Sequence, residues 1–322
     1  MIKKIILVNI VIIIFVLGII EFLSLHAIKN KYAEQTEIQI KNSVNKEEVR
    51  KLTEVKYHKV KKFVYEERIQ KCLARVFKGN KKGSIITMGC SYTDGAGLQE
   101  NQTFAYKLNK LTDRTTYNRG VGASGPQLVY RQLSDKNFKN EIPEADYIIY
   151  TFIYDHFNRL AHNLVAYFNS DLHLNYYINN KGELAEVQYP FWFLYYFYTT
   201  KVISEYREFL YLQQFDKRYK LFLKIMEESV KAMKKNYPNA KFILLEFPEA
   251  RMCKKDYIKG ESELTKEQIK DIEKLGIIYI NAEELVGHPF RDIEKYRLPD
   301  KDHPNERVWD EIVPALAKKL NL

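Results

Sequence analysis

The sequence has few of the residues that would cross-link a chain or make it repetitive. Its 322 residues include three cysteines, Cys72, Cys90 and Cys253, and none of them forms a C-x-x-C pattern. This argues against a zinc finger and against a disulfide framework, and leaves only a Cys72–Cys253 bridge open. The 13 glycines and 9 prolines exclude collagen-like and low-complexity architectures. With 46% hydrophobic residues the chain is not wholly disordered, and its length allows one large domain or two small ones.

Most of the chain also lacks an excess of charge of either sign. The net charge is +10, but residues 29–82 alone hold 16 basic and 7 acidic side chains, an excess of nine. Residues 83–322 hold 33 side chains of each sign and are neutral overall. A nucleic-acid-binding protein carries its basic face on the folded domain. The neutral body therefore argues against a nucleic acid as a partner.

The N-terminus is an almost unbroken apolar run, IILVNIVIIIFVLGIIEFLSL, over residues 5–25. A helix of this length spans about 30 Å, the thickness of a bilayer's hydrocarbon core. We therefore predict that residues 1–28 are an uncleaved transmembrane anchor that contacts membrane lipid. A cleaved signal peptide would share the basic start Lys3-Lys4, but its apolar region is normally shorter and no good cleavage site follows here. The two lysines favour a single-pass cell-membrane protein with a cytoplasmic N-terminus and an extracytoplasmic body.

Residues 29–82 are polar and rich in lysine, with scattered apolar positions at mixed helical spacing. We interpret this segment as a solvated, basic helical stem between the membrane and the body. The alternative is a basic stretch that lies on anionic lipid headgroups.

From residue 83 on, short apolar runs alternate with segments of helical spacing. Such alternation predicts an α/β domain over 83–322, a parallel sheet covered on both faces that binds ligands at the carboxyl ends of its strands. One interruption, residues 156–216, contains the aromatic run YPFWFLYYFY at 189–198. We interpret it as a helical subdomain packed on the core, with an acyl or sugar pocket or a membrane-interface contact as alternatives. Strands are expected at 84–89, 115–121, 145–154, 240–246 and 277–281, and helices at 103–111, 127–133, 220–235 and 305–320.

Two segments carry side chains suited to acyl transfer. Ser91 directly follows the first predicted strand, where its own N–H near a helix start can stabilise an oxyanion. Asp300 stands three residues before His303, a spacing that lets a carboxylate hold one imidazole nitrogen while the other faces a nucleophile. Alone, the serine is more often a cap or turn residue, and Asp-x-x-His arises often by chance. A metal site of Asp300, Asp302 and His303 ranks lower, because no second cluster has ligand spacing.

Together these segments resemble the SGNH/GDSL hydrolase superfamily. Gly89-Cys90-Ser91 looks like its first block, NRGVGASG at 118–125 like its second, and Asp300-Lys301-Asp302-His303-Pro304 like its last. The resemblance covers about 84–320 without the aromatic insertion. It implies a flavodoxin-like, three-layer α/β/α sandwich with Ser91 as nucleophile, His303 as base and Asp300 as its orienter, and it implies no metal and no cofactor.

The third block of the superfamily, Gly-x-Asn-Asp, is not matched. Its Asn donates to the oxyanion, whereas here the end of the third strand reads FIYDHFNR at 152–159 and Tyr154 holds the Asn position. Tyr154, His156, Asn158 or Arg159 would have to substitute, and we favour His156 or Arg159. In the second block the backbone donor falls at Gly122 or Ala123.

The sequence thus predicts a membrane-anchored, extracytoplasmic serine esterase or acyltransferase. By analogy the favoured substrates are ester groups, O-acetyl above all, of a cell-envelope glycan, and a lipid ester comes second. The competing class is a non-catalytic envelope protein that uses the fold as a binding scaffold, which the lost Asn favours. The sequence identifies no envelope partner protein.

Overall fold

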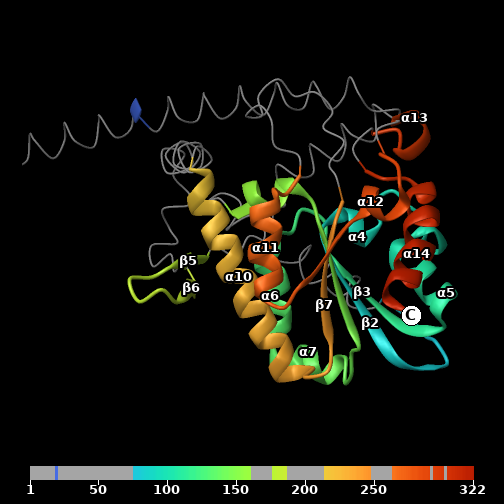
Figure 1. Cartoon of the computed structure of the whole chain (residues 1–322), viewed down its shortest axis with the longest axis horizontal. Helices are drawn as coiled ribbons and strands as arrows, with labels where there is room; N and C mark the ends of the chain where they lie inside the picture. The colour runs from blue at the N-terminus through green and yellow to red at the C-terminus, as the bar shows by residue number, and fades with distance from the viewer. Residues whose placement is uncertain are drawn as a thin grey trace, which may run out of the picture. The chain divides into compact units, whose positions relative to one another are not determined.

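A computed structural model describes residues 19–20, 75–160, 176–186, 214–247, 263–290, 293–300 and 303–322. Ile19 and Ile20 are helical and belong to a separate unit; all other described residues belong to one. That unit is built on a six-stranded sheet (Figure 1). In sheet order its strands are β1 (Val76–Phe77), β3 (Arg114–Gly120), β2 (Lys81–Gly89), β4 (Tyr147–Phe152), β7 (Lys241–Glu246) and β8 (Ile278–Asn281).

The five strands from β3 to β8 are parallel to one another. Taken along the sheet, their chain order is 2-1-3-4-5, the order of flavodoxin-like folds, with the switch point between β2 and β4. Every residue of β4 is buried, as expected for a strand covered on both faces. The predicted α/β sheet is confirmed, with one correction: β1 is an antiparallel edge strand, so the sheet is not purely parallel.

Helices cover both faces of the sheet (Figure 1). On each face, a cluster of buried hydrophobic side chains lies between the sheet and its helices. On the first face lie α6 (Pro126–Ser134), α7 (Lys136–Glu141), α10 (Phe215–Asn236) and α11 (Lys266–Lys274); on the second lie α5 (Phe104–Thr112), α12 (Ala282–Val286) and α14 (Glu306–Leu320). Short helical turns complete the unit: α4 (Ser91–Asp94), η1 (Glu100–Gln102), η2 (Tyr154–Leu160) and α13 (Ile293–Tyr296).

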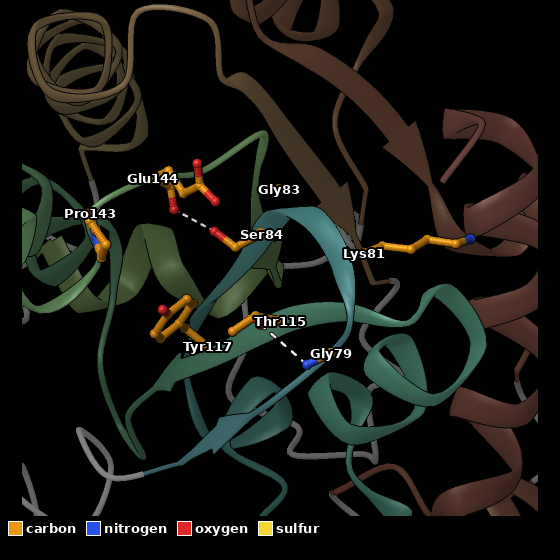
Figure 2. A pocket seen from close by; sticks show the side chains of 8 residues that line it. All are labelled: Gly79, Lys81, Gly83, Ser84, Thr115, Tyr117, Pro143 and Glu144. Carbon is orange, nitrogen blue, oxygen red and sulfur yellow. Dashed lines mark hydrogen bonds between the residues drawn. The ribbon is translucent and has the colours of Figure 1, made fainter.

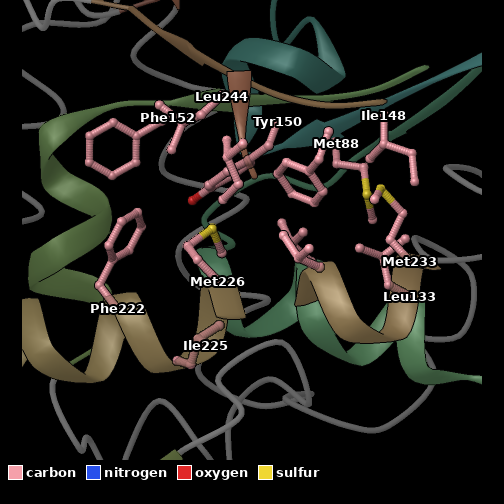
Figure 3. Close-up of a cluster of buried hydrophobic side chains, with 14 of the residues drawn as sticks. Met88, Leu133, Ile148, Tyr150, Phe152, Phe222, Ile225, Met226, Met233 and Leu244 are labelled. Carbon is pink, nitrogen blue, oxygen red and sulfur yellow. The ribbon is translucent and has the colours of Figure 1, made fainter. Parts of the chain in front are cut away.

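The largest helix, α10, shows how the apolar pattern is used. Its Phe222 faces Phe152 on β4, and its Met226 and Met233 face Tyr150 and Ile148 of the same strand (Figure 3). All six are buried, and each such side chain contributes about 1.5–3 kcal/mol relative to an exposed one. This packing fixes the carboxyl end of β4, and with it the start of η2.

Two predicted boundaries need correction. β1 and the first residues of β2 lie inside the predicted stem, because Val76 and Phe77 pair with β3. Within the insertion predicted as helical, β5 (Tyr176–Ile178) and β6 (Leu184–Glu186) form an antiparallel hairpin. The turn between them, with Gly182 at φ +77°, closes this hairpin.

Other predictions fall outside the described residues. These are the rest of the anchor and of the stem, the aromatic run at 189–198, Cys72 and Cys253. In the described part of the chain no helix combines the length and apolar character needed to cross a membrane.

Candidate active site

Ser91 lies at the carboxyl edge of the sheet, where β2 turns into α4. Cys90 is the N-cap of this helix and Ser91 its first residue, a position whose N–H no helical carbonyl can reach. The turn requires the glycine before it: Gly89 has φ +143°, and an added Cβ would lie 2.3 Å from Thr93 Oγ1. The local sequence therefore exposes the serine and its N–H together at the switch point of the sheet.

The Asp300–His303 segment is presented by a narrow antiparallel turn. Leu298 N donates to His303 O at 2.9 Å, and Asn305 N donates to Tyr296 O at 3.0 Å. Asn305 then caps α14, since its side-chain oxygen accepts from Arg307 N at 3.1 Å. The turn is thus fixed to the start of the last helix.

The structure brings Ser91, His303 and Asp300 together in one hydrogen-bonded chain. His303 Nε2 lies 2.9 Å from Ser91 Oγ, and His303 Nδ1 lies 2.7 Å from Asp300 Oδ2. Asp300 Oδ1 also accepts from the His303 backbone N–H at 3.0 Å. A carboxylate on Nδ1 makes that nitrogen the donor, which leaves Nε2 as the acceptor facing the serine hydroxyl. This is the arrangement in which a serine can lose its proton to an imidazole as it attacks a carbonyl.

The glycine-bearing loop after β3 lies against this serine. Val121 N donates to Gly89 O at 2.9 Å, which ties the loop to the turn before Ser91. A Cβ added to Gly122 would have Ser91 Cβ as its nearest neighbour, at 4.0 Å. Within the described residues, the N–H groups of Gly122 and Ala123 have no hydrogen-bond partner. Gly122 and Ser91 therefore offer backbone N–H donors on neighbouring segments, as an oxyanion requires.

His156 is not at this surface, which corrects its prediction as an oxyanion or substrate ligand. Its ring is fully buried, stacks on Tyr150 and has Nδ1 2.6 Å from the Tyr150 hydroxyl. Burial, together with the nearby Arg159 cation, lowers the pKa of His156 well below its usual value. A neutral core histidine is the result.

Tyr154 also lies in the core. It is 6% exposed, and its ring packs on Phe157 and stacks parallel to Phe215 with centroids 6.0 Å apart. Asn158 is engaged as well, because its Oδ1 accepts from Arg218 Nη1 at 2.5 Å. Neither residue replaces the missing Asn as a side chain directed at Ser91.

The guanidinium of Arg159 contacts the glycine-bearing loop, but it binds a backbone carbonyl of the loop and does not point at Ser91. Nη1 donates to Ser124 O at 2.6 Å, and Nε donates to Asp155 Oδ2 at 2.8 Å. Burial would lower the pKa of Arg159, but Cys90 and Asp155 beside it outweigh this and raise it. Sequence reasoning missed Ser124 and Asp155; the only signal for them was their place within the second and third blocks.

A pocket of about 470 Å³ lies at the other edge of the sheet (Figure 2). Its walls are the amino ends of β2 and β3 and the segment before β4, where Ser84 Oγ donates to Glu144 O. None of the predicted site residues lines it. In the described chain no cluster of three or more His, Cys, Asp or Glu could hold a metal ion; Asp302, of the alternative metal site, lies outside that part.

No family model and no curated protein sequence matches this chain, whereas several solved structures are similar to it. A carbohydrate esterase family 2 enzyme of Corynascus shares 13% identity and a TM-score of 0.41, over 76% of this chain and 69% of that one. A psychrotrophic esterase of Pseudoalteromonas shares 14% and 0.42, over 75% and 100%. A lipolytic protein of the G-D-S-L family from Desulfitobacterium hafniense shares 11% and 0.36, over 74% and 99%.

By their names two of these proteins are esterases and the third is a lipolytic protein of the G-D-S-L family. Identities and TM-scores this low do not bear on the family, the reaction or the substrate of this chain. Those have to be argued from the site.

Proposed function

We propose that this chain is a serine esterase in which Ser91 is the nucleophile. The observation that carries the proposal is the hydrogen-bond chain from Ser91 Oγ through His303 to Asp300, built from segments more than 200 residues apart in the sequence. A serine that merely caps a helix needs no imidazole on its hydroxyl. An imidazole that is merely exposed needs no carboxylate on its second nitrogen.

In the proposed reaction each step of ester cleavage is carried out by one group of the site. Ser91 Oγ attacks the carbonyl carbon while His303 Nε2 takes the hydroxyl proton, and Asp300 stabilises the imidazolium that forms. The same proton is passed to the leaving alkoxide, which departs as an alcohol and leaves an acyl-serine. Water then attacks the acyl group with His303 again as base, and acid and free serine result.

Negative charge on the carbonyl oxygen is met by the backbone N–H groups of Ser91 and Gly122. Such donors act without reorganisation, and removal of one typically costs about 10²–10³ in kcat. Because both are backbone groups, their presence does not depend on the Asn that the third block lacks. This favours an active enzyme over the alternative, a non-catalytic scaffold.

For the substrate we propose an ester of a cell-envelope glycan, with acetyl as the first acyl group to test and a lipid ester as the second. The predicted anchor at residues 1–28 motivates this class, because it would hold the body beside the membrane outside the cytoplasm. An acceptor hydroxyl in place of water would make the same site an acyltransferase.

A fluorophosphonate probe tests the assignment of Ser91. The wild-type chain and Ser134→Ala, which changes an exposed serine on α6, should be labelled once, while Ser91→Ala should not be labelled. Turnover of p-nitrophenyl acetate should follow the same pattern and survive EDTA. Wild-type turnover by Ser91→Ala would refute the esterase, and an unlabelled wild-type chain would support the scaffold.

A further inference from the structure

We propose that Arg159 is a positioning residue for the oxyanion-binding loop, residues 121–125, and does not itself contact the substrate. The inference rests on the proposed function, because it assigns to Arg159 a part in the same reaction. The sequence suggested that Arg159 donates to the oxyanion directly. We infer instead that Arg159 acts as a clamp: it holds the backbone of the loop whose Gly122 N–H is the donor.

The first observation is how the guanidinium of Arg159 is used. Nη1 donates to the carbonyl oxygen of Ser124 at 2.6 Å, and Nε donates to Asp155 Oδ2 at 2.8 Å. The Arg159 side chain is 19% exposed. The backbone carbonyl of Arg159 accepts from Gln127 Nε2 at 2.5 Å. A planar fork held on two sides is oriented toward the protein, not toward a ligand.

The second observation is that Ser124 is also fixed through its side chain. Its hydroxyl donates to Gly89 O at 2.9 Å, the same carbonyl that accepts from Val121 N. Gly89 begins the turn that presents Ser91. The loop is therefore held both by the nucleophile turn and by Arg159.

The third observation is that the loop needs such support. Ala123, between Gly122 and Ser124, has φ +64°, a left-handed conformation that costs free energy for any residue with a Cβ. A loop with this strain relaxes when one of its anchors is removed. Relaxation would move the Gly122 N–H relative to Ser91, and a transition-state contact is sensitive to such a shift.

The place of Arg159 in the chain fits this role. It belongs to η2, which directly follows β4, where the resemblance predicts an Asn that donates to the oxyanion. Here the segment supplies an arginine that holds the neighbouring loop. The charge of Asp155, four residues earlier, fixes the guanidinium in turn.

Hydrogen exchange of the loop amides, measured in the wild-type chain and in variants, tests the clamp directly. In Arg159→Ala the amides of Val121 and Ser124, which donate to Gly89 O and Val121 O, should exchange at least about tenfold faster, while amides of β4 keep their protection. Arg159→Lys should lie between the two, because an ammonium can reach one of the two partners but lacks the planar fork. Arg131→Ala is the matched control, since it removes an exposed arginine that pairs with Glu186 at 3.3 Å.

The kinetic arm uses p-nitrophenyl acetate with the same four proteins. Arg159→Ala should lower kcat about 10- to 100-fold with KM little changed, and Arg159→Lys should recover part of the loss. Unchanged exchange in Arg159→Ala overturns the clamp, as does faster exchange with wild-type kcat. If Arg159→Ala does not fold, the lysine variant decides by the same criteria. A wild-type chain that cleaves no ester contradicts the proposed function instead, and the exchange comparison, which needs no substrate, still decides whether Arg159 holds the loop.

Discussion

Replacing Asp300 by Asn should lower kcat strongly, although the two side chains have almost the same size and shape. The two Asp300 oxygens have separate tasks, since Oδ1 accepts from the His303 backbone N–H and Oδ2 from Nδ1. Asparagine has a single acceptor oxygen. If that oxygen keeps the backbone N–H, its NH₂ group faces Nδ1 and makes this nitrogen the acceptor.

The proton of the neutral imidazole then sits on Nε2, which faces Ser91 at 2.9 Å. A protonated Nε2 cannot take the serine proton, so the base is blocked while the geometry stays intact. A misdirected tautomer of this kind costs about 10⁴ in kcat, or about 5 kcal/mol of transition-state stabilisation. In Asp300→Ala, by contrast, water can reach Nδ1, since the Asp300 side chain is 48% exposed. We therefore expect Asp300→Ala to retain more activity than Asp300→Asn.

The assay is kcat and kcat/KM for p-nitrophenyl acetate in wild type, Asp300→Asn, Asp300→Ala and Asp300→Glu, with urea unfolding to show that each is folded. Fluorophosphonate labelling of Ser91 should slow in the same order as turnover. An Asp300→Asn variant within tenfold of the wild-type kcat would refute the reasoning, because Nε2 would then still be the acceptor.

Four further outcomes follow from the structure. Gly122→Ala should fold normally, since the new Cβ has no neighbour nearer than 4.0 Å, yet lose about 10²-fold in kcat because the methyl group faces Ser91; equal kcat contradicts this. His156→Ala should lower the free energy of unfolding by about 2–4 kcal/mol with kcat nearly unchanged, as urea unfolding and kinetics can show. Burial raises the pKa of Glu246 from 4.5 to about 7, so the neutral carboxyl contributes stability at low pH that is lost as the pH rises through about 7. Wild type should therefore lose up to about 3 kcal/mol of stability relative to Glu246→Gln between pH 4 and 8, and parallel pH profiles would refute this. The full-length chain should stay with membranes in alkaline carbonate, whereas a chain that starts at residue 30 should not; a soluble full-length chain contradicts the predicted anchor.

Much of the sheet could be predicted because buried parallel strands are short apolar runs. The run at 145–154 became β4, and the run at 240–246 became β7, each within two residues of its predicted limits. β1 escaped prediction because a two-residue strand carries no periodicity; it exists only through its pairing with β3. The β5–β6 hairpin was hidden for a similar reason, since its three-residue strands show no clear alternation.

The candidate site, like the sheet, could be predicted only in part. Ser91, Asp300 and His303 could be found because each follows from a local pattern, a turn after a strand or a fixed spacing of three residues. The prediction for His156 was wrong because the spacing from His156 to Arg159 gives a shared face but not which way that face points. Packing against Tyr150 decides this, and Tyr150 is buried by contacts with α10 that no local pattern reveals.

The structure offers a physical explanation for a site without the Asn that the resemblance predicts in the third block. A side-chain donor depends on the identity of one residue, whereas the N–H groups of Ser91 and Gly122 depend only on the path of the chain. What the path requires is that both turns keep their shape, and the shared carbonyl of Gly89 links them. An arginine that fixes the loop can therefore maintain the two backbone donors, although no side chain of the described third-block segment supplies a third. A site with fewer donors stabilises the oxyanion less, and its rate should depend more steeply on the leaving group. Hydrolysis of a series of phenyl acetates with leaving groups of different pKa measures that slope, and Arg159→Ala should make it steeper still.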